Sequence, residues 1–403
     1  MGLVLQNALL VDLDPPRVES GGLRVDRGRI VARGGVAAGP ADTVHDCRGA
    51  VVLAGLVNGH THLYSALAVG LPPPADAPAC FREILERVWW RLDQALDEAA
   101  IEVSARVGAW DAVRCGTTTL IDHHASPGCI AGSLDAVERG AGGVGVRLVQ
   151  CYETTDRHGP DGARLGLEEN RRYLERCARR RDGRCAALVG AHAAFTLERR
   201  TLEALAGLAD EFGTGVHLHV AEDAIDEAEV RRRHGCSLLE LLAETGVLRP
   251  AAVLAHGTHL GPADRPLLER YRPAVVHNPR SNMNNAVGYA AVADLPGPVL
   301  LGTDGLGGDL LTEARFAWCK ARDARRPLDP ERVLAMLAAS ARRASAALGV
   351  TLGRLEPGAA ADLVVTDYVP AAPLTAANRF GHLVFGLGPQ HVRDVLIDGR
   401  WVW

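Results

Sequence analysis

Short runs of apolar residues alternate with longer amphipathic segments through the middle of the chain. This alternation is typical of parallel strands joined by helices, because a strand covered on both faces is apolar throughout whereas its covering helix is apolar on one side. We count eight such strands, each ending near a polar residue. The eight end residues are His62, His124, Glu153, His192, His219, His256, His277 and Asp304.

Two of the intervening segments show helical periodicity with clear ends. Apolar residues recur at helical spacing from Thr201 to Phe212, and Gly213 follows as a stop signal. A second stripe begins after Asp329 and Pro330, which have the order expected of an N-cap and a first helical residue, and it runs as far as Gly349. We expect a helix in each segment.

Eight strand and helix units predict an α/β fold, the (β/α)8 TIM-type barrel, in which catalytic residues stand at the C-terminal ends of the strands. The two ends of the chain differ, since they contain short alternating pieces separated by turn signals. We expect residues 1–55 and 353–403 to form one small β-sandwich beside a barrel domain of residues 56–352. The apolar run 50–57, which lies just before His60, reads as a single buried strand.

Composition limits the classes of partner. The chain has 403 residues, 47% of them hydrophobic, and a net charge of −5, so nothing indicates a surface for nucleic acid or for an anionic membrane. The start of the chain lacks a basic and apolar leader, and no apolar run is long enough to span a bilayer. Nine scattered cysteines read as reduced core residues. We therefore expect a cytoplasmic protein.

The string His60-Thr61-His62 is the strongest chemical signal in the sequence. Alternate residues of a strand share a face, so both imidazoles point the same way and form half of a metal site. His219 and Asp304 stand at the ends of two other strands and can supply the remaining ligands. A solvated pair of histidines is the competing interpretation, and the two further ligands count against it.

The motifs along the chain resemble those of the amidohydrolase superfamily, in its aminohydrolase and chlorohydrolase branch, and most closely the SsnA-type aminohydrolases. The resemblance spans the chain. The superfamily resemblance is carried by the strings Val57-Asn58-Gly59-His60-Thr61-His62, Gly190-Ala191-His192, His217-Leu218-His219-Val220-Ala221-Glu222, Ala255-His256-Gly257, Val276-His277-Asn278-Pro279-Arg280-Ser281-Asn282 and Gly302-Thr303-Asp304-Gly305. The SsnA-type resemblance is carried by His62-Leu63-Tyr64-Ser65, Leu85-Glu86-Arg87-Val88-Trp89-Trp90-Arg91-Leu92-Asp93, Asp122-His123-His124-Ala125-Ser126-Pro127 and Ser281-Asn282-Met283-Asn284-Asn285-Ala286-Val287-Gly288.

The resemblance implies one divalent metal, zinc or alternatively iron, and a homodimer or larger assembly. Glu222 and His256 would handle protons, and His192 would face the substrate. The metal ligands would be His60, His62, His219 and Asp304.

A pair of metals bridged by a modified lysine is excluded, because the only lysine, Lys320, follows the eighth strand. A bridging carboxylate from Glu153 stays open, although one metal is the simpler interpretation. His217 reads as a hydrogen-bonded core histidine more readily than as a second ligand.

These residues predict hydrolytic deamination of a nitrogen heterocycle of the purine, pyrimidine, pterin or triazine type. A metal-bound hydroxide would attack, Asp304 would accept the water proton, His256 would bind the developing oxyanion, and Glu222 would protonate a ring nitrogen before ammonia leaves. Hydrolytic dechlorination or cyclic amide hydrolysis could use the same groups. A catalytically inactive barrel that serves as a binding or assembly protein is the alternative from another class.

Further candidates carry two interpretations each. Trp90, beside Trp89, could cover a flat substrate ring or pack in the core. His277 could contact the substrate or close its strand by hydrogen bonding. Of His123 and His124, which are adjacent, only one can face inward. The asparagines at 282, 284 and 285 are expected to shape a loop rather than to touch the substrate.

Overall fold

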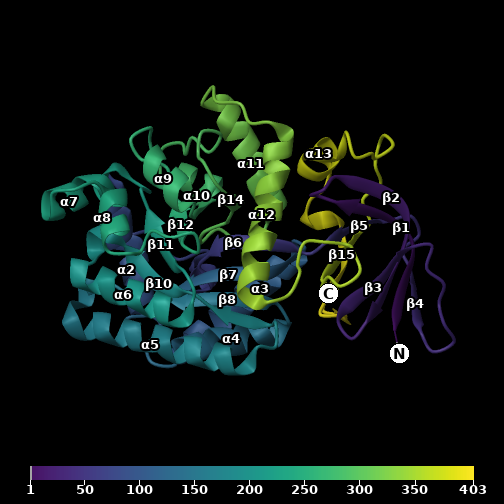
Figure 1. The fold of residues 1–403 in the computed structure, drawn as a ribbon, viewed down its shortest axis with the longest axis horizontal. Coiled ribbons are helices and arrows are strands. Elements are labelled where there is room, and N and C mark those ends of the chain that lie inside the picture. The colour runs from purple at the N-terminus through teal and green to yellow at the C-terminus, as the bar shows by residue number, and fades with distance from the viewer. Residues whose placement is uncertain (1) are drawn as a thin grey trace.

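The computed structural model describes residues 2–403 and shows two parts. The larger part has two sheets and the other part has one. Parallel strands surrounded by helices form the larger part, and strands from both ends of the chain lie together at its side (Figure 1). The mixed α/β content agrees with the prediction. Among the residues described, no helix is both long and apolar enough to cross a bilayer.

Every strand pairing in the larger part is parallel. One sheet has the order β6-β7-β8-β9, and the other has the order β10-β11-β12-β13-β14. The strands are β6 (Leu56–Thr61), β7 (Thr117–His124), β8 (Arg147–Tyr152), β9 (Cys185–Ala187), β10 (Val189–Ala193), β11 (Val216–Val220), β12 (Val253–His256), β13 (Ala274–His277) and β14 (Val299–Leu301).

The two parallel sheets meet at both of their edges. β9 and β10 are separated only by Leu188, so the fourth predicted strand is shared between the sheets. At the other edge the amides of Thr303 and Asp304 each donate to the carbonyl oxygen of His60 at 3.0 Å, and Thr61 forms a parallel bridge with Asp304. The structure thus differs from the predicted single closed sheet, because regular pairing stops at these two edges.

Helices follow the strands in sequence and cover the parallel sheets. The two helices predicted from periodicity are confirmed, with Gly213 in the left-handed conformation after the first and Asp329 capping the second. The longer helices are α3 (Glu98–Arg114), α4 (Ser133–Val144), α5 (Gly159–Arg180), α6 (Arg199–Phe212), α7 (Ala224–His234), α8 (Leu238–Glu244), α9 (Arg265–Tyr271), α10 (Pro279–Asn284), α11 (Leu310–Asp323) and α12 (Pro330–Leu348). Short helical turns are η1 (Leu63–Ala68), α1 (Phe81–Ile84), η2 (Leu85–Trp89), α2 (Trp90–Gln94), η3 (Asp156–His158), η4 (Ala194–Thr196), α13 (Arg379–Gly381), η5 (His382–Gly386) and η6 (Pro389–His391).

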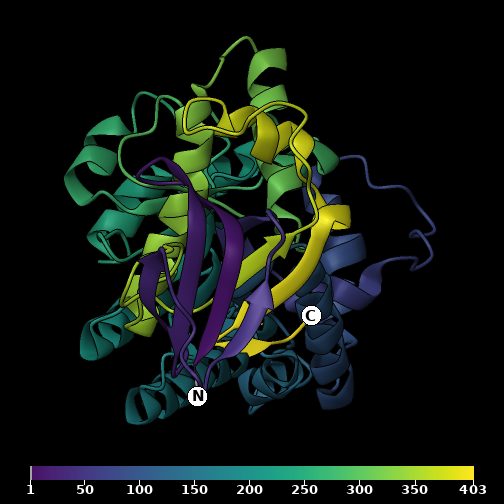
Figure 2. The ribbon, with the colours of Figure 1, turned by 90° about the vertical axis from the view of Figure 1, so that its right-hand side faces the viewer.

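Strands from both ends of the chain belong to one sheet of eight strands, in the order β17-β16-β15-β5-β1-β2-β3, with β4 paired to β1. Figure 2 shows the N-terminal strands in purple beside the C-terminal strands in yellow. The expected meeting of the two segments is therefore present, whereas their arrangement as a sandwich stays a prediction. The strands are β1 (Leu3–Asp12), β2 (Arg17–Asp26), β3 (Arg29–Gly34), β4 (Thr43–Asp46), β5 (Val51–Ala54), β15 (Leu363–Thr366), β16 (Val392–Ile397) and β17 (Arg400–Trp401).

The prediction of one strand over residues 50–57 is wrong. The run breaks at Gly55 into β5, which pairs with β1 and β15 in the terminal sheet, and β6, which pairs with β7 in the parallel part. A Cβ atom on Gly55 would lie 2.2 Å from Oγ1 of Thr118, so only glycine fits where the chain crosses between the sheets. Apolar character alone could not reveal this break.

A buried ion pair joins the two parts of the molecule. Arg147, at the start of β8, donates from Nε to Oδ2 of Asp362 at 2.7 Å and from Nη2 to Oδ1 at 2.9 Å. Asp362 directly precedes β15 of the terminal sheet, and Arg147 also reaches Asp398 after β16. The bidentate geometry fixes the terminal sheet against the parallel strands.

Candidate active site

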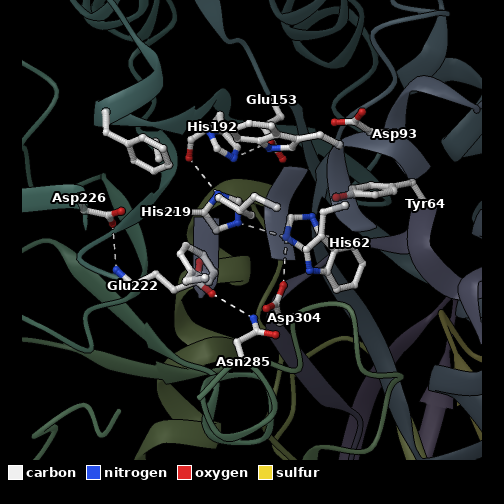
Figure 3. A pocket seen from close by; sticks show the side chains of 16 residues that line it. His62, Tyr64, Asp93, Glu153, His192, His219, Glu222, Asp226, Asn285 and Asp304 are labelled. Atoms are coloured by element: carbon white, nitrogen blue, oxygen red, sulfur yellow. Dashed lines mark hydrogen bonds and ion pairs between the residues drawn. The ribbon is translucent and has the colours of Figure 1, made fainter. Parts of the chain in front are cut away.

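Most of the predicted site residues converge at the C-terminal ends of the parallel strands, in or directly beside a pocket bordered by aromatic and acidic side chains (Figure 3). This is the end at which side chains from different strands and loops can meet around a ligand. The lining residues are His62, Tyr64, Phe81, Leu85, Trp89, Trp90, Asp93, Glu153, His192, Ala193, Phe195, His219, Glu222, Asp226, Asn285 and Asp304.

His62 and His219 direct the same ring nitrogen toward one point. Nδ1 of His62 lies 2.6 Å from the carbonyl oxygen of His123, and Nδ1 of His219 lies 2.9 Å from that of His192. A carbonyl oxygen only accepts, so each Nδ1 carries the proton and each Nε2 presents a lone pair in the neutral ring. The two Nε2 atoms are 3.2 Å apart, and that of His62 is 3.0 Å from Oδ1 of Asp304.

His60 completes this cluster from the strand that also carries His62. Its Nε2 is buried without a hydrogen-bond partner and lies 3.6 Å from Oδ1 of Asp304. Nδ1 of His60 is 2.9 Å from Nε2 of His217, which orients the ring from behind. Donor atoms of His60, His219 and Asp304 lie within 4.8 Å of one another, and one of His256 lies within the same distance of all three. Nε2 of His62 joins the cluster through its contacts with His219 and Asp304. Three lone-pair nitrogens around a carboxylate are the donor set of a divalent metal site.

The electrostatics of the cluster favour a positive charge at its centre. Burial lowers the pKa of His62, but the hydrogen bond and charge of Asp304 outweigh burial and raise this pKa to about 9. Burial would raise the pKa of Asp304, yet the neighbouring imidazoles of His60 and His62 hold it well below its usual range. The carboxylate is thus ionised, and a cation placed between these side chains is stabilised.

Asp304 is held in a strained backbone conformation by contacts on its far side. Its φ angle is +55°, and the φ angle of His256 is +76°, both in the left-handed region that costs non-glycine residues free energy. The hydroxyl of Ser281 donates to Oδ2 of Asp304, which leaves Oδ1 facing the histidines. The hydroxyl of Thr61 donates to its carbonyl oxygen at 3.0 Å.

Glu222 and His256 form a buried pair beside the cluster. Nδ1 of His256 lies 2.8 Å from Oδ1 of Asn282 and therefore carries a proton, so Nε2 presents a lone pair 3.4 Å from Oε2 of Glu222. Burial, followed by repulsion from Asp304, raises the pKa of Glu222 well above its usual value, and burial lowers that of His256. A protonated Glu222 facing a neutral imidazole is an arrangement suited to general acid chemistry.

A second carboxylate, that of Glu153, lies at the opposite end of the pocket. Its Oε2 is 3.3 Å from Nδ1 of His123, and its Oε1 is 3.5 Å from Nε2 of His192. Figure 3 shows Glu153 and Asp93 at this end, with His62 and His219 between them and the pair Glu222 and Asp304. The pocket therefore has two acidic ends separated by histidines.

Aromatic rings form the walls between these ends. Trp90 packs edge-on against His192 with ring centroids 6.1 Å apart, and the guanidinium of Arg157 lies 4.4 Å from the centroid of the Trp90 ring. Arg157 also pairs with Asp93 at 3.2 Å. Trp90 thus lines the pocket, as one of its two interpretations expected, and Trp89 lines it as well.

His277 differs from the expectation of a substrate contact. Its ring is 1% exposed, lies edge-on to Tyr289 at 6.4 Å between centroids, and does not line the pocket. Both ring nitrogens lack a hydrogen-bond partner among residues 2–403. We therefore correct that assignment.

Sequence reasoning assigned no pocket role to several lining residues, Asn285 and Asp93 among them, and left the orientation of two others open. Asn285, expected to shape a loop, lines the pocket and donates to Oε1 of Glu222 at 3.3 Å. Asp93 belongs to one of the strings that carry the resemblance, but it lies in α2, away from any strand end, and no role followed from its position. His123 faces the interior cluster, whereas Nε2 of His124 lies 2.9 Å from the hydroxyl of Ser126.

Comparison with known proteins places the chain among hydrolases. The profile described as "Amidohydrolase family" matches residues 51–402. A 5-methylthioadenosine/S-adenosylhomocysteine deaminase from Desulforudis audaxviator is 30% identical over 420 residues, which cover 100% of this chain and 93% of the relative.

Solved structures with the same fold include two zinc proteins. A crystal structure of an adenosine deaminase from Xanthomonas campestris with bound zinc has a TM-score of 0.85 and 24% identity, covering 99% of this chain and 92% of the other. An atrazine chlorohydrolase from Arthrobacter aurescens TC1 complexed with zinc has a TM-score of 0.81 and 22% identity, covering 99% and 94%. These likenesses show the fold.

Proposed function

Because this chain belongs to the amidohydrolase family, we propose that it is a metal-dependent hydrolase that deaminates a nitrogen heterocycle and releases ammonia. The observation that carries the proposal is the juxtaposition of two differently ionised carboxyl groups, Asp304 and Glu222, around one set of histidine lone pairs. An ionised base and a protonated acid are what hydrolytic removal of an amino group requires. The deaminase activity named for the relative of 30% identity supports this assignment.

We further propose that the eight parallel strands close into a (β/α)8 barrel of residues 56–352. The hydrogen bonds from Thr303 and Asp304 to His60 and the near continuity of β9 and β10 support closure. Residues 1–55 and 353–403 would then form the separate β-sandwich domain, joined to the barrel by Arg147. The change of partner sheet at Gly55 supports the first boundary.

The ligands proposed for a single divalent metal, zinc by preference and iron as the alternative, are His60, His62, His219 and Asp304. The buried lone pairs described above fit such an ion in number and in chemistry. When bound, the ion lowers the pKa of water and so supplies a nucleophile at neutral pH.

Asp304 and Glu222 then carry out the two proton transfers, and His256 supplies a hydrogen bond. Asp304, ionised and held by Ser281, accepts the proton of the attacking water. Nε2 of His256 lies 3.9 Å from Oδ2 of Asp304 and can hydrogen-bond to the oxygen that is added to the substrate. Glu222 holds its proton, is oriented by Asn285, and delivers the proton to a ring nitrogen of the substrate. His192 and Trp90 contact the heterocycle from the pocket wall.

The decisive experiment combines elemental analysis with a product screen. Purified protein loaded with zinc is incubated with purines, pyrimidines, pterins and triazines while ammonia, chloride and ring-opened acids are measured separately. We expect one metal per chain and ammonia from at least one heterocycle. Chloride or a ring-opened acid as the main product would replace deamination by dechlorination or cyclic amide hydrolysis at the same site.

A further inference from the structure

Glu153 is a buried carboxylate that the proposed mechanism does not use. It directly follows β8, its exposed fraction is 4%, and it lines the pocket at the end away from Glu222. A buried carboxylate in a ligand pocket costs free energy unless it is paired with a cation or with hydrogen-bond donors. The protein has therefore placed an unusually strong acceptor where a substrate would lie.

The histidine next to Glu153 on the pocket wall does not supply a donor to it. Nδ1 of His192 lies 2.8 Å from the hydroxyl of Thr196, and this hydroxyl itself donates to the carbonyl oxygen of Ala193 at 3.0 Å. The Thr196 oxygen must accept from Nδ1, so Nε2 of His192 presents a lone pair. That lone pair and Oε1 of Glu153 face each other at 3.5 Å, two acceptors without a donor.

His123, on the other side of Glu153, also presents a lone pair to the carboxylate instead of a donor. Nε2 of His123 lies 3.1 Å from the carbonyl oxygen of His217 and so carries a proton, which leaves Nδ1 as an acceptor in the neutral ring. This Nδ1 and Oε2 of Glu153 are both buried without a hydrogen-bond partner, 3.3 Å apart. The polar atoms around Glu153 are therefore hydrogen-bond acceptors without a donor. A bound group that donates hydrogen bonds and carries positive charge would be stabilised between them.

The charge of the whole pocket agrees with this requirement. Five of the 16 described residues that line it are Asp or Glu, and none is Lys or Arg. The nearby guanidinium of Arg157 is engaged by Asp93 at 3.2 Å and by the ring of Trp90. The aromatic walls formed by Trp89, Trp90 and other rings also suit a flat cation.

We propose that Glu153 and His192 form a recognition site for a protonated nitrogen group of the substrate, of the ammonium, amidinium or guanidinium class. The enzyme then prefers cationic heterocycles, with the charged group at Glu153 and the reacting carbon near Asp304. This inference rests on the proposed function, because it describes the other end of the same bound substrate. Two or three N–H groups of such a cation can bond to Oε1 of Glu153 and Nε2 of His192 together.

A second metal ion is the competing use of this carboxylate. Donor atoms of His62, His123, Glu153 and His219 lie within 4.8 Å of one another. However, the Nε2 atoms of His62 and His219 converge beside Asp304, and each nitrogen has one lone pair to give. Of these four residues only His123 and Glu153 would remain for a second ion, and His192 does not belong to the group. The recognition of a cationic group therefore fits the geometry better.

The test measures binding of two flat probes of equal size, phenylguanidinium and phenylurea, to the zinc-loaded protein at pH 7 by isothermal titration calorimetry. We expect the wild type to bind the cation at least about tenfold more tightly than its neutral analogue. Glu153→Gln should abolish this preference and keep the zinc content unchanged, and Glu153→Asp, which keeps the charge, should retain most of it. Glu168→Gln is the matched control, since it makes the same exchange at an exposed carboxylate of α5 outside this pocket, and it should keep the preference.

Three results would overturn the inference. They are an equal affinity for both probes in the wild type, an equal loss of preference in Glu153→Gln and Glu168→Gln, and a fall in zinc content in Glu153→Gln. The binding readout needs no turnover, so a cation preference without ammonia release would refute only the proposed deamination. Ammonia release from neutral heterocycles at a kcat/KM unchanged in Glu153→Gln would refute only the recognition site.

Discussion

Nε2 of His217 lies 2.9 Å from Nδ1 of His60, so a histidine on β11 orients a proposed metal ligand on β6. Removing such an orienting partner typically costs metal affinity about 10-fold to 100-fold. We predict that His217→Leu weakens zinc binding by this amount, as measured by competition with a chromophoric chelator. His277→Leu is the matched control, because it also removes a buried histidine from a strand of the same sheet and should leave zinc affinity unchanged. Equal affinities in all three proteins would refute the role of His217.

Glu222→Gln should keep the metal and lose turnover. Glutamine preserves the size of the side chain but cannot deliver a proton, and loss of general acid catalysis typically lowers the rate about 10²-fold to 10⁴-fold. The measurement is the rate of ammonia release alongside the metal content of the same sample. Glu203→Gln, on the exposed face of α6, serves as the control. Turnover close to that of the wild type would mean that another residue is the acid.

The pH dependence of stability should carry a signature of Asp122. Burial raises the pKa of this carboxyl to about 7, against an ordinary value of 3.8, and its Oδ1 accepts from the amide of Leu63 at 2.8 Å. Between these two pKa values the unfolded chain binds fewer protons at this group than the folded protein does, so its contribution to stability falls as the pH rises.

Asp122→Asn retains an acceptor for Leu63 and removes this titration. We expect the free energy of unfolding of the wild type to fall more steeply between pH 5 and pH 8 than that of the variant, as measured by urea denaturation of the zinc-loaded proteins. Contributions of other carboxyl groups are common to both and cancel in the difference. Parallel pH profiles would contradict the raised pKa of Asp122.

Metal removal should abolish ammonia release and lower thermal stability together. A ligand that binds only the folded state at about 1,000 times its Kd stabilises that state by about 4 kcal/mol. Treatment with dipicolinic acid should therefore lower Tm, and the addition of zinc should restore both Tm and activity. In Asp304→Ala, zinc should restore neither. A Tm that does not respond to zinc in the wild type would argue against the proposed ligands.

Arg147 should be essential to the stability of the whole chain. Its guanidinium neutralises Asp362, which is 3% exposed, and removal of one partner of a buried pair leaves an uncompensated charge at a cost of about 3–5 kcal/mol. Arg147→Met should lower the free energy of unfolding by this amount, whereas the double variant with Asp362→Leu should recover much of it. A loss of under about 1 kcal/mol would show that the pair is not a structural link.

The ends of the parallel strands could be predicted because an apolar run followed by a polar residue can be recognised in a short stretch of sequence. His62, His192 and Asp304 lie where the order of eight strands placed them. The division of the pairing into two sheets could not be predicted, since it depends on contacts between distant segments such as Thr303 and His60. The break at Gly55 was likewise invisible, because it follows from the approach of Thr118, far along the chain.

Site residues that directly follow a strand could be predicted from the sequence. Those contributed by loops and short helices could not. The resemblance supplied roles for Glu222 and His256, and the structure brings their side chains to 3.4 Å. Asn285 and Asp93 come from helical segments outside the strand pattern, so their approach depends on tertiary packing. His277 shows the opposite error, because a strand-end position does not decide toward which side of the strand a ring points.

The terminal sheet has a consequence for how the chain matures on the ribosome. β5 pairs on one side with β1 and on the other with β15, which is synthesised only after all the parallel strands. Until then the nascent protein exposes an unsatisfied apolar edge, the kind of surface on which aggregation begins. Chains that stall before residue 363 therefore cannot cover β5, and they should depend on chaperones in proportion to the time for which that edge stays open.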